Sequence, residues 1–73
     1  MRAVTYEQLL KAIARNVRAR RTALGISQEE AADRAEMAVR QWQRIEAGRG
    51  IVLRTLVAAA AGLGAEVADL LRR

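Results

Sequence analysis

Hydrophobic residues recur at helical spacing along the chain, in segments separated by short polar or glycine-containing stretches. The first segment places apolar side chains at Leu10, Ile13, Val17 and Leu24. Thr5 and Gln8 have the spacing of a capping box, in which two side chains satisfy backbone N–H groups at a helix start. The pattern predicts a first helix that begins at Thr5 and ends at Gly25, because glycine commonly follows the last helical turn.

Two further helices are predicted in close succession. Ser27 and Glu30 form the motif of a second capping box, which predicts a short helix over Gln28 to Ala35. After a tight link, a third helix is predicted over about Ala38 to Ala47, ending at Gly48. Two short helices joined in this way are typical of a helix-turn-helix, here over residues 27–48.

The rest of the chain predicts two more helices, at about Leu53 to Ala61 and Val67 to Leu71, with Gly-Leu-Gly between them. Five short helices leave little room for anything else in 73 residues. The predicted fold class is therefore all-α, with one domain over residues 1–73. A chain of this length buries only roughly 60% of its unfolded surface, so its core is small.

The predicted third helix has two different faces on a helical wheel. Ala38 and Ile45 lie within about 60° of Trp42, which predicts that the tryptophan belongs to the core and does not stack on bases. The opposite face carries Arg40, Gln43, Arg44 and Ala47, with Val39 at its edge. This face is either an ordinary solvated surface or a recognition surface, since Arg and Gln form bidentate hydrogen bonds with guanine and adenine.

Glu46 leans toward the core side of the same helix, about 40° from Trp42 on the wheel. It also lies at the helix C-terminus, where the helix dipole disfavours a carboxylate. A partly buried carboxylate requires a cationic partner. An arginine of the basic first helix is the predicted partner.

Charge and composition narrow the classes of function. The chain has 13 Lys and Arg against 8 Asp and Glu, a net charge of +5, and Lys11 is its only lysine. This balance points to nucleic acid, although an arginine bias of the source genome could produce the same excess. Cys and His are absent, so no disulfide, metal site or cofactor is expected. The apolar runs are too short for a membrane span and no secretory signal is visible, which predicts a soluble, cytoplasmic protein.

These residues resemble the helix-turn-helix family of phage repressors, Cro proteins and their bacterial relatives, the XRE class. The resemblance rests on three stretches, "RRTALGISQEEAADRA", "WQRIEAG" and "TLVAAAAGLGAEVADLL", and covers about Ile13 to Leu71. It implies a lambda-repressor-like fold and binding to double-stranded DNA. The sequence departs from the family pattern at four positions. Leu is usual at Ala31, Gly is common at Glu36, and a capping Ser or Thr is usual at Ala38; the fourth departure is Trp42.

The resemblance also implies roles for individual residues. Arg21 takes the place of the family arginine that pairs with the glutamate at Glu46. Gln28 takes the place of a glutamine that contacts a phosphate and braces the recognition helix, and Arg49 lies in a loop that often reaches the DNA backbone. The positions that contact base edges are those of Val39, Arg40, Gln43 and Arg44.

The function predicted from these features is a sequence-specific transcriptional regulator, more specifically a repressor, that binds a two-fold symmetric operator as a homodimer. The dimer contact is predicted at the C-terminal end, where the large apolar residues are Leu63, Val67, Leu70 and Leu71. The alternative function is a DNA-binding antitoxin or another protein that binds a toxin or other partner. An enzyme is not expected, because the chain has no His or Cys and its single serine, Ser27, serves as a helix cap.

Overall fold

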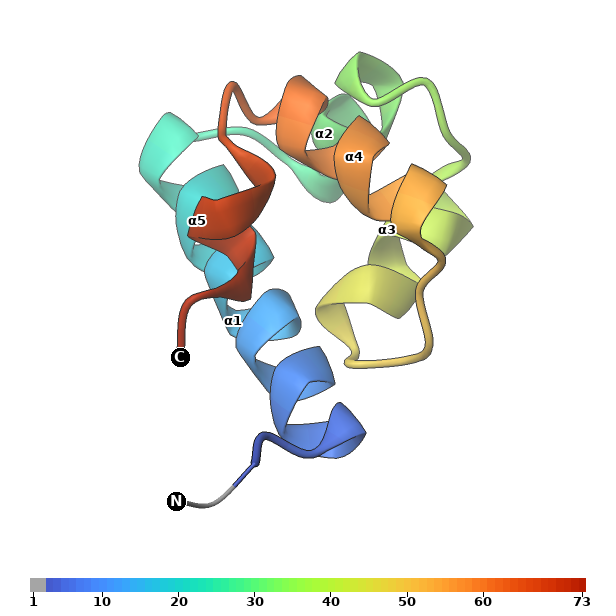
Figure 1. The fold of residues 1–73 in the computed structure, drawn as a ribbon. Coiled ribbons are helices and arrows are strands. Elements are labelled where there is room, and N and C mark those ends of the chain that lie inside the picture. Colours follow the sequence, from blue (N-terminus) through green and yellow to red (C-terminus); the bar gives the residue numbers. More distant parts are fainter. Residues whose placement is uncertain (1–2) are drawn as a thin grey trace.

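The computed structural model describes residues 3–73, and five α-helices form this part of the chain (Figure 1). They are α1 (Tyr6–Leu24), α2 (Gln28–Arg34), α3 (Val39–Glu46), α4 (Leu53–Gly62) and α5 (Val67–Leu71). No strand occurs among residues 3–73, so the predicted all-α class is confirmed. Helix α1 spans 19 residues and is bounded as predicted, by the cap at Thr5 and by Gly25. Met1 and Arg2, which belong to the predicted single domain, lie outside the described residues.

Two of the other helices pack directly against α1. Both α3 and α5 pack against α1, α2 packs against α3 and α4, and α4 also contacts α5. In Figure 1, α5 lies alongside α1, and the other three helices form the opposite half of the molecule. This arrangement places the α2–α3 pair at one side of the domain, with α1 and α4 behind it as support.

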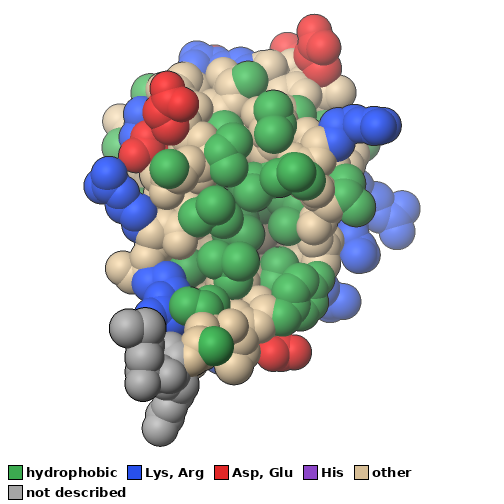
Figure 2. Space-filling model, viewed as in Figure 1, with side chains coloured by type: hydrophobic (Ala, Val, Ile, Leu, Met, Phe, Trp, Pro, Cys, Tyr) green, Lys and Arg blue, Asp and Glu red, His purple; other side chains and the backbone are tan. Residues whose placement is uncertain are grey.

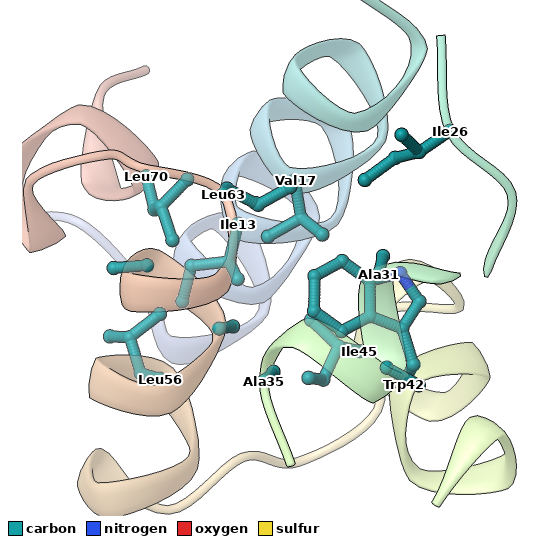
Figure 3. Close-up of a cluster of buried hydrophobic side chains, with 13 residues drawn as sticks. Ile13, Val17, Ile26, Ala31, Ala35, Trp42, Ile45, Leu56, Leu63 and Leu70 are labelled. Carbon is teal, nitrogen blue, oxygen red and sulfur yellow. The ribbon is translucent and has the colours of Figure 1, made fainter. Parts of the chain in front are cut away.

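The core is built around the single tryptophan. Trp42 of α3 is 0% exposed, which confirms the prediction from the helical wheel. Its ring lies beside Ala31, and the small side chains of Ala31 and Ala35 leave space for it (Figure 3). The large Trp42 is therefore matched by the small Ala31, where the family pattern usually has Leu. A larger residue at one position and a smaller one at the other is a volume-conserving change, which protein cores tolerate well.

Helices α2 and α4 approach each other closely at Ala35 and Gly62. A Cβ atom at position 62 would lie 3.0 Å from the Ala35 nitrogen and 3.1 Å from the Ala35 Cβ. Because such contacts are tighter than ordinary packing, a side chain at position 62 would require the Ala35 backbone to shift by a few tenths of an ångström, and glycine avoids this.

The two predicted capping boxes have different outcomes. At α1, the Thr5 hydroxyl accepts a hydrogen bond from the Gln8 nitrogen, and the Gln8 side chain accepts one from the Thr5 nitrogen, both at 3.1 Å. At α2, only half of the motif forms: the Ser27 hydroxyl accepts from the Glu30 nitrogen at 3.0 Å. The Glu30 carboxylate instead pairs with Arg34 one turn later, because an i,i+4 arginine competes for it.

The end of α1 and the C-terminal segment differ from the predicted pattern. Leu24 is 45% exposed and is not a core residue, because α1 extends past the helices that cover it. Asn16, which lies in the middle of α1, holds the C-terminal end. Its side-chain nitrogen donates to the carbonyl oxygens of Leu70 at 2.9 Å and Arg72 at 2.6 Å.

Glu36, in the link between α2 and α3, has a left-handed backbone with φ of 56°. A side chain with a Cβ atom is strained in this conformation by about 1–2 kcal/mol, whereas glycine is not. The link requires this left-handed conformation at Glu36, because it lets the next residue, Met37, donate its N–H to the Ala32 carbonyl at 2.9 Å. The position thus suits the glycine that is common there in the family pattern.

We therefore expect Glu36→Gly to raise the free energy of unfolding by about 0.5–1 kcal/mol, after allowance for the greater freedom of glycine in the unfolded chain. Urea denaturation of the two proteins measures this change. Glu36→Ala is the control, since it removes the same carboxylate but keeps the strain. Equal stability of the Gly and Ala variants would show that the backbone strain is not the cause.

Candidate nucleic-acid interface

Helix α3 separates buried and exposed side chains along its length. Trp42, Ile45 and Glu46 are buried, whereas Arg40, Gln43 and Arg44 are exposed, as the helical wheel predicts. The helix starts at Ala38, whose side chain makes no capping hydrogen bond. Its position therefore depends on its packing and on the polar contacts of its last turn.

The exposed side of α3 continues onto the following loop. A shallow hollow there is lined by Arg40, Gln43, Arg44, Ala47 and Arg49. Within residues 3–73, none of the three arginine side chains has a hydrogen bond or an ion pair with another residue. Their guanidinium groups therefore present unpaired donors and positive charge to solvent, on a surface without an acidic residue.

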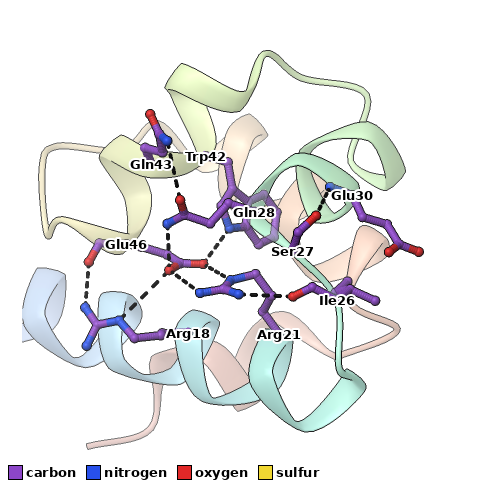
Figure 4. Close-up of polar contacts among 9 residues, drawn as sticks. All are labelled: Arg18, Arg21, Ile26, Ser27, Gln28, Glu30, Trp42, Gln43 and Glu46. Atoms are coloured by element: carbon purple, nitrogen blue, oxygen red, sulfur yellow. Dashed lines mark hydrogen bonds and ion pairs between the residues drawn. The ribbon is translucent and has the colours of Figure 1, made fainter.

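The buried side of α3 is held by an ion pair between Arg21 and Glu46 (Figure 4). The Arg21 Nε donates to Glu46 Oε2 at 2.6 Å, and its Nη2 donates to Oε1 at 3.0 Å. The contact is bidentate, which is the strong geometry for this pair. Arg21 also donates to the Ile26 carbonyl at 3.0 Å, so a single guanidinium joins α1, the start of α2 and α3.

Three more side chains complete the surroundings of Glu46. The Trp42 indole N–H donates to Glu46 Oε2 at 2.6 Å, and the Gln28 amide donates to Oε1 at 3.1 Å. Arg18 donates to the Glu46 backbone carbonyl at 2.8 Å, which satisfies one of the free carbonyls at the end of α3. The Gln28 oxygen in turn accepts from Gln43 at 3.4 Å, so the network reaches the exposed side of α3.

These contacts determine the ionisation states of Glu46 and Arg21. Burial alone would raise the pKa of Glu46, but hydrogen bonds from Arg21, Trp42 and Gln28 outweigh it and lower the pKa below its ordinary value of 4.5. The hydrogen bond to Glu46 raises the pKa of Arg21. Both groups are therefore ionised at neutral pH.

The remaining predicted DNA-contact residues, Arg49, Val39 and Gln28, differ in how exposed their side chains are. Arg49 is exposed in the loop after α3. Val39 is half-buried and packs at the edge of the core, so only part of its side chain faces outward. Gln28 is half-buried at the start of α2, where its side chain is already engaged with Glu46 and Gln43.

Sequence reasoning missed two contacts of Glu46: the hydrogen bond from Trp42 to its carboxylate and the hydrogen bond from Arg18 to its backbone carbonyl. The contact between Trp42 and Glu46 could have been predicted, because residues four apart on a helix are neighbours and the helical wheel places Trp42 on the same side as Glu46. The contact from Arg18 to a backbone carbonyl could not, since it depends on how α1 and α3 cross.

The predicted dimer residues need a correction. Leu63 and Leu70 are 3% and 1% exposed, because both fill the core between α1, α4 and α5. They have almost no surface to offer a second chain, so their assignment to a dimer contact was wrong. Val67 and Leu71 are half-buried and retain part of their surface.

No helix within residues 3–73 is both long and apolar enough to cross a membrane. The same residues contain no group of three or more acidic side chains placed to hold a metal ion.

Comparison with known proteins gives two matches. The profile of a family described as the helix-turn-helix domain matches residues 12–73. The fold is similar to the crystal structure of a hypothetical transcription factor, NHTF, from Neisseria. That similarity has a TM-score of 0.84 at 29% sequence identity and covers 99% of this chain and 84% of the other. No curated protein matches the chain.

Proposed function

Since the chain belongs to the family described as the helix-turn-helix domain, we propose that it is a sequence-specific DNA-binding transcriptional regulator, and more specifically a repressor of the phage-repressor type. The similar Neisseria protein is a hypothetical transcription factor, which supports the regulatory role. Double-stranded DNA is the proposed partner, with α3 as the helix that enters the major groove.

The observation that carries this proposal is the exposed side of α3. Arg40 and Arg44 lie one turn apart there, and both lack a partner among residues 3–73. Because the network around Glu46 fixes the opposite side of the helix, these arginines project from a well-positioned backbone. Arginine side chains held in this way can read guanine edges in the major groove.

The proposed contacts divide into two classes. Base edges are contacted by Arg40 and Arg44, with Gln43 suited to adenine and the outward part of Val39 to a thymine methyl group. The DNA backbone is contacted by Arg49, from the loop after α3, and by the start of α2 at Gln28. The Gln28 side chain also braces Gln43, so its loss would affect both classes of contact.

We also propose that the chain binds its operator as a homodimer, because one domain of this size makes too small an interface for tight and selective binding. Val67 and Leu71 retain apolar surface on α5. On α4, Leu53 is 72% exposed and Val57, one turn later, is 50% exposed. Figure 2 shows hydrophobic side chains over the middle of the face that carries α4 and α5, with charged side chains around its rim. An uncharged contact suits two copies that would otherwise repel through their net charge of +5.

A single titration experiment tests the proposal. The preferred site is first selected from random duplexes, and affinity is then measured between 50 and 200 mM salt. Each phosphate neutralised contributes about −0.9 to the slope of log affinity against log salt, so the Arg49 side chains of a dimer alone give a slope of about −1.8. Affinity that does not change with salt would contradict DNA binding through these cations.

The same titration tests the dimer. We expect saturation at two chains per duplex and half-sites whose centres lie about 34 Å, or one DNA turn, apart. Saturation at one chain on a site without a two-fold repeat would exclude the homodimer and leave DNA binding intact. Val67→Glu then tests the α5 surface, since a charge in an apolar contact should weaken binding of the second chain.

A further inference from the structure

Tyr6, the first residue of α1, is left unexplained by the family match, which starts at residue 12. The side chain is 60% exposed, which is unusual for a large aromatic residue. Its hydroxyl group has no hydrogen-bond partner among residues 3–73. A mostly exposed ring contributes little to the core, so its position calls for another explanation.

The Tyr6 hydroxyl lies beside the loop that joins α3 to α4. A Cβ atom at position 50 would be 3.0 Å from the Tyr6 Oη, so Gly50 allows the hydroxyl to approach the loop backbone. Figure 1 places the start of α1 and this loop at the same end of the molecule. The residue before Gly50 is Arg49, which lines the hollow with Arg40 and Arg44. The hydroxyl therefore lies against the loop residue that directly follows Arg49.

We infer that Tyr6 is a DNA backbone contact, in which its hydroxyl donates a hydrogen bond to a phosphate next to the one bound by Arg49. Tyrosine hydroxyls are regular donors to DNA phosphates, and such contacts fix the register of a protein on the duplex. The inference rests on the proposed function. It extends that function to the first turn of α1, which the matched residues 12–73 do not include.

A neutral donor has a signature that separates it from the arginines. Arg49 releases a counterion when it binds a phosphate, whereas an uncharged hydroxyl releases none. Loss of the Tyr6 hydroxyl should therefore weaken binding at every salt concentration without changing the slope. Since a backbone contact carries no sequence information, the loss should also be equal on the selected site and on random DNA.

The test compares the wild-type chain of 73 residues with Tyr6→Phe, Tyr6→Leu and Arg49→Ala. Tyr6→Phe keeps the ring and removes only the hydroxyl, so we expect it to bind about fivefold more weakly with an unchanged salt slope. Arg49→Ala should reduce the magnitude of the slope by about 0.9 for each chain bound. Thermal unfolding of each variant shows whether it is folded during the measurement.

Each outcome decides the inference. If Tyr6→Phe binds as tightly as wild type, the hydroxyl contact is excluded, and weaker binding by Tyr6→Leu alone would assign the ring a bracing role against the loop. If Tyr6→Phe changes the salt slope, the residue acts through a charged neighbour and the direct contact is also excluded. If the wild-type chain itself binds no duplex, the proposed function fails, and the Tyr6 contact fails with it.

Discussion

Replacing either Arg21 with Met or Glu46 with Gln should lower the free energy of unfolding by about 3–5 kcal/mol, because each change leaves the other charge buried without its partner. Glu46 is 6% exposed and the Arg21 side chain 18%, so water cannot replace the lost contact. Chemical denaturation measures the effect. For a domain of this size, a loss this large brings the protein close to its unfolding threshold at room temperature.

A double-mutant cycle isolates the pair from the packing of its side chains. With both residues replaced, no charge is stranded, so the double variant should lose clearly less stability than the sum of the two single changes. The matched control is the exposed pair of Glu30 and Arg34, whose contact distance is 3.0 Å and whose side chains are about half exposed. Its coupling should not exceed about 0.5 kcal/mol. Additivity at Arg21 and Glu46 would show that the buried pair contributes no coupling.

The lowered pKa of Glu46 predicts the pH dependence of the same stability. A carboxyl group with a lower pKa in the folded state than in the unfolded chain stabilises the fold at pH values above its unfolded pKa, close to 4.5. This contribution is lost as pH falls from that value through the folded pKa. Wild-type stability should therefore decline in this acidic range, and the decline should be smaller in Glu46→Gln.

Changing Arg40 or Arg44 to Ala should weaken binding to the selected DNA site by about 1–3 kcal/mol, and should weaken binding to random DNA less. The reason is that a bidentate contact to guanine is lost in full only where the guanine is present. Affinities of each variant for both kinds of DNA measure the difference. Lys11→Ala is the control, because it removes one exposed positive charge from α1 without touching α3.

An equal loss of affinity for selected and random DNA would show that the altered arginine contacts the DNA backbone and not a base. A loss of the same size in Lys11→Ala would show that net charge, and not the position of the arginine, determines affinity. The stability of Arg40→Ala and Arg44→Ala should remain close to that of wild type, since neither exposed side chain has a hydrogen bond or an ion pair with another residue among residues 3–73.

The helix boundaries were predictable because their signals are local. Thr5 and Ser27 cap the helices that follow them, and Gly25, Gly48 and Gly64 adopt the left-handed backbone that ends a helix. The division of α3 into two faces was predictable for a similar reason, since it follows from 3.6 residues per turn. The pairing of Arg21 with Glu46, which the family resemblance implied, is present in the structure.

Other features depend on how distant segments meet, and sequence patterns carry little information about that. Leu63 and Leu70 were assigned to a surface because the C-terminal segment has many apolar residues, yet the packing of α5 on α1 buries both. Asn16 holds the carbonyls of Leu70 and Arg72, more than fifty residues away, through contacts that no spacing reveals. The approach of Tyr6 to Gly50 likewise exists only because the start of α1 lies beside the loop between α3 and α4.

The two faces of α3 have a consequence for changing the DNA target of the protein. Trp42, Ile45 and Glu46 are buried in the fold, whereas Arg40, Gln43 and Arg44 are exposed and make few or no polar contacts with other residues among residues 3–73. A library that varies only the outward positions would therefore sample new specificities on an almost unchanged scaffold. Gln43 is the exception, because its bond to Gln28 links it to the buried network, and it would be varied last.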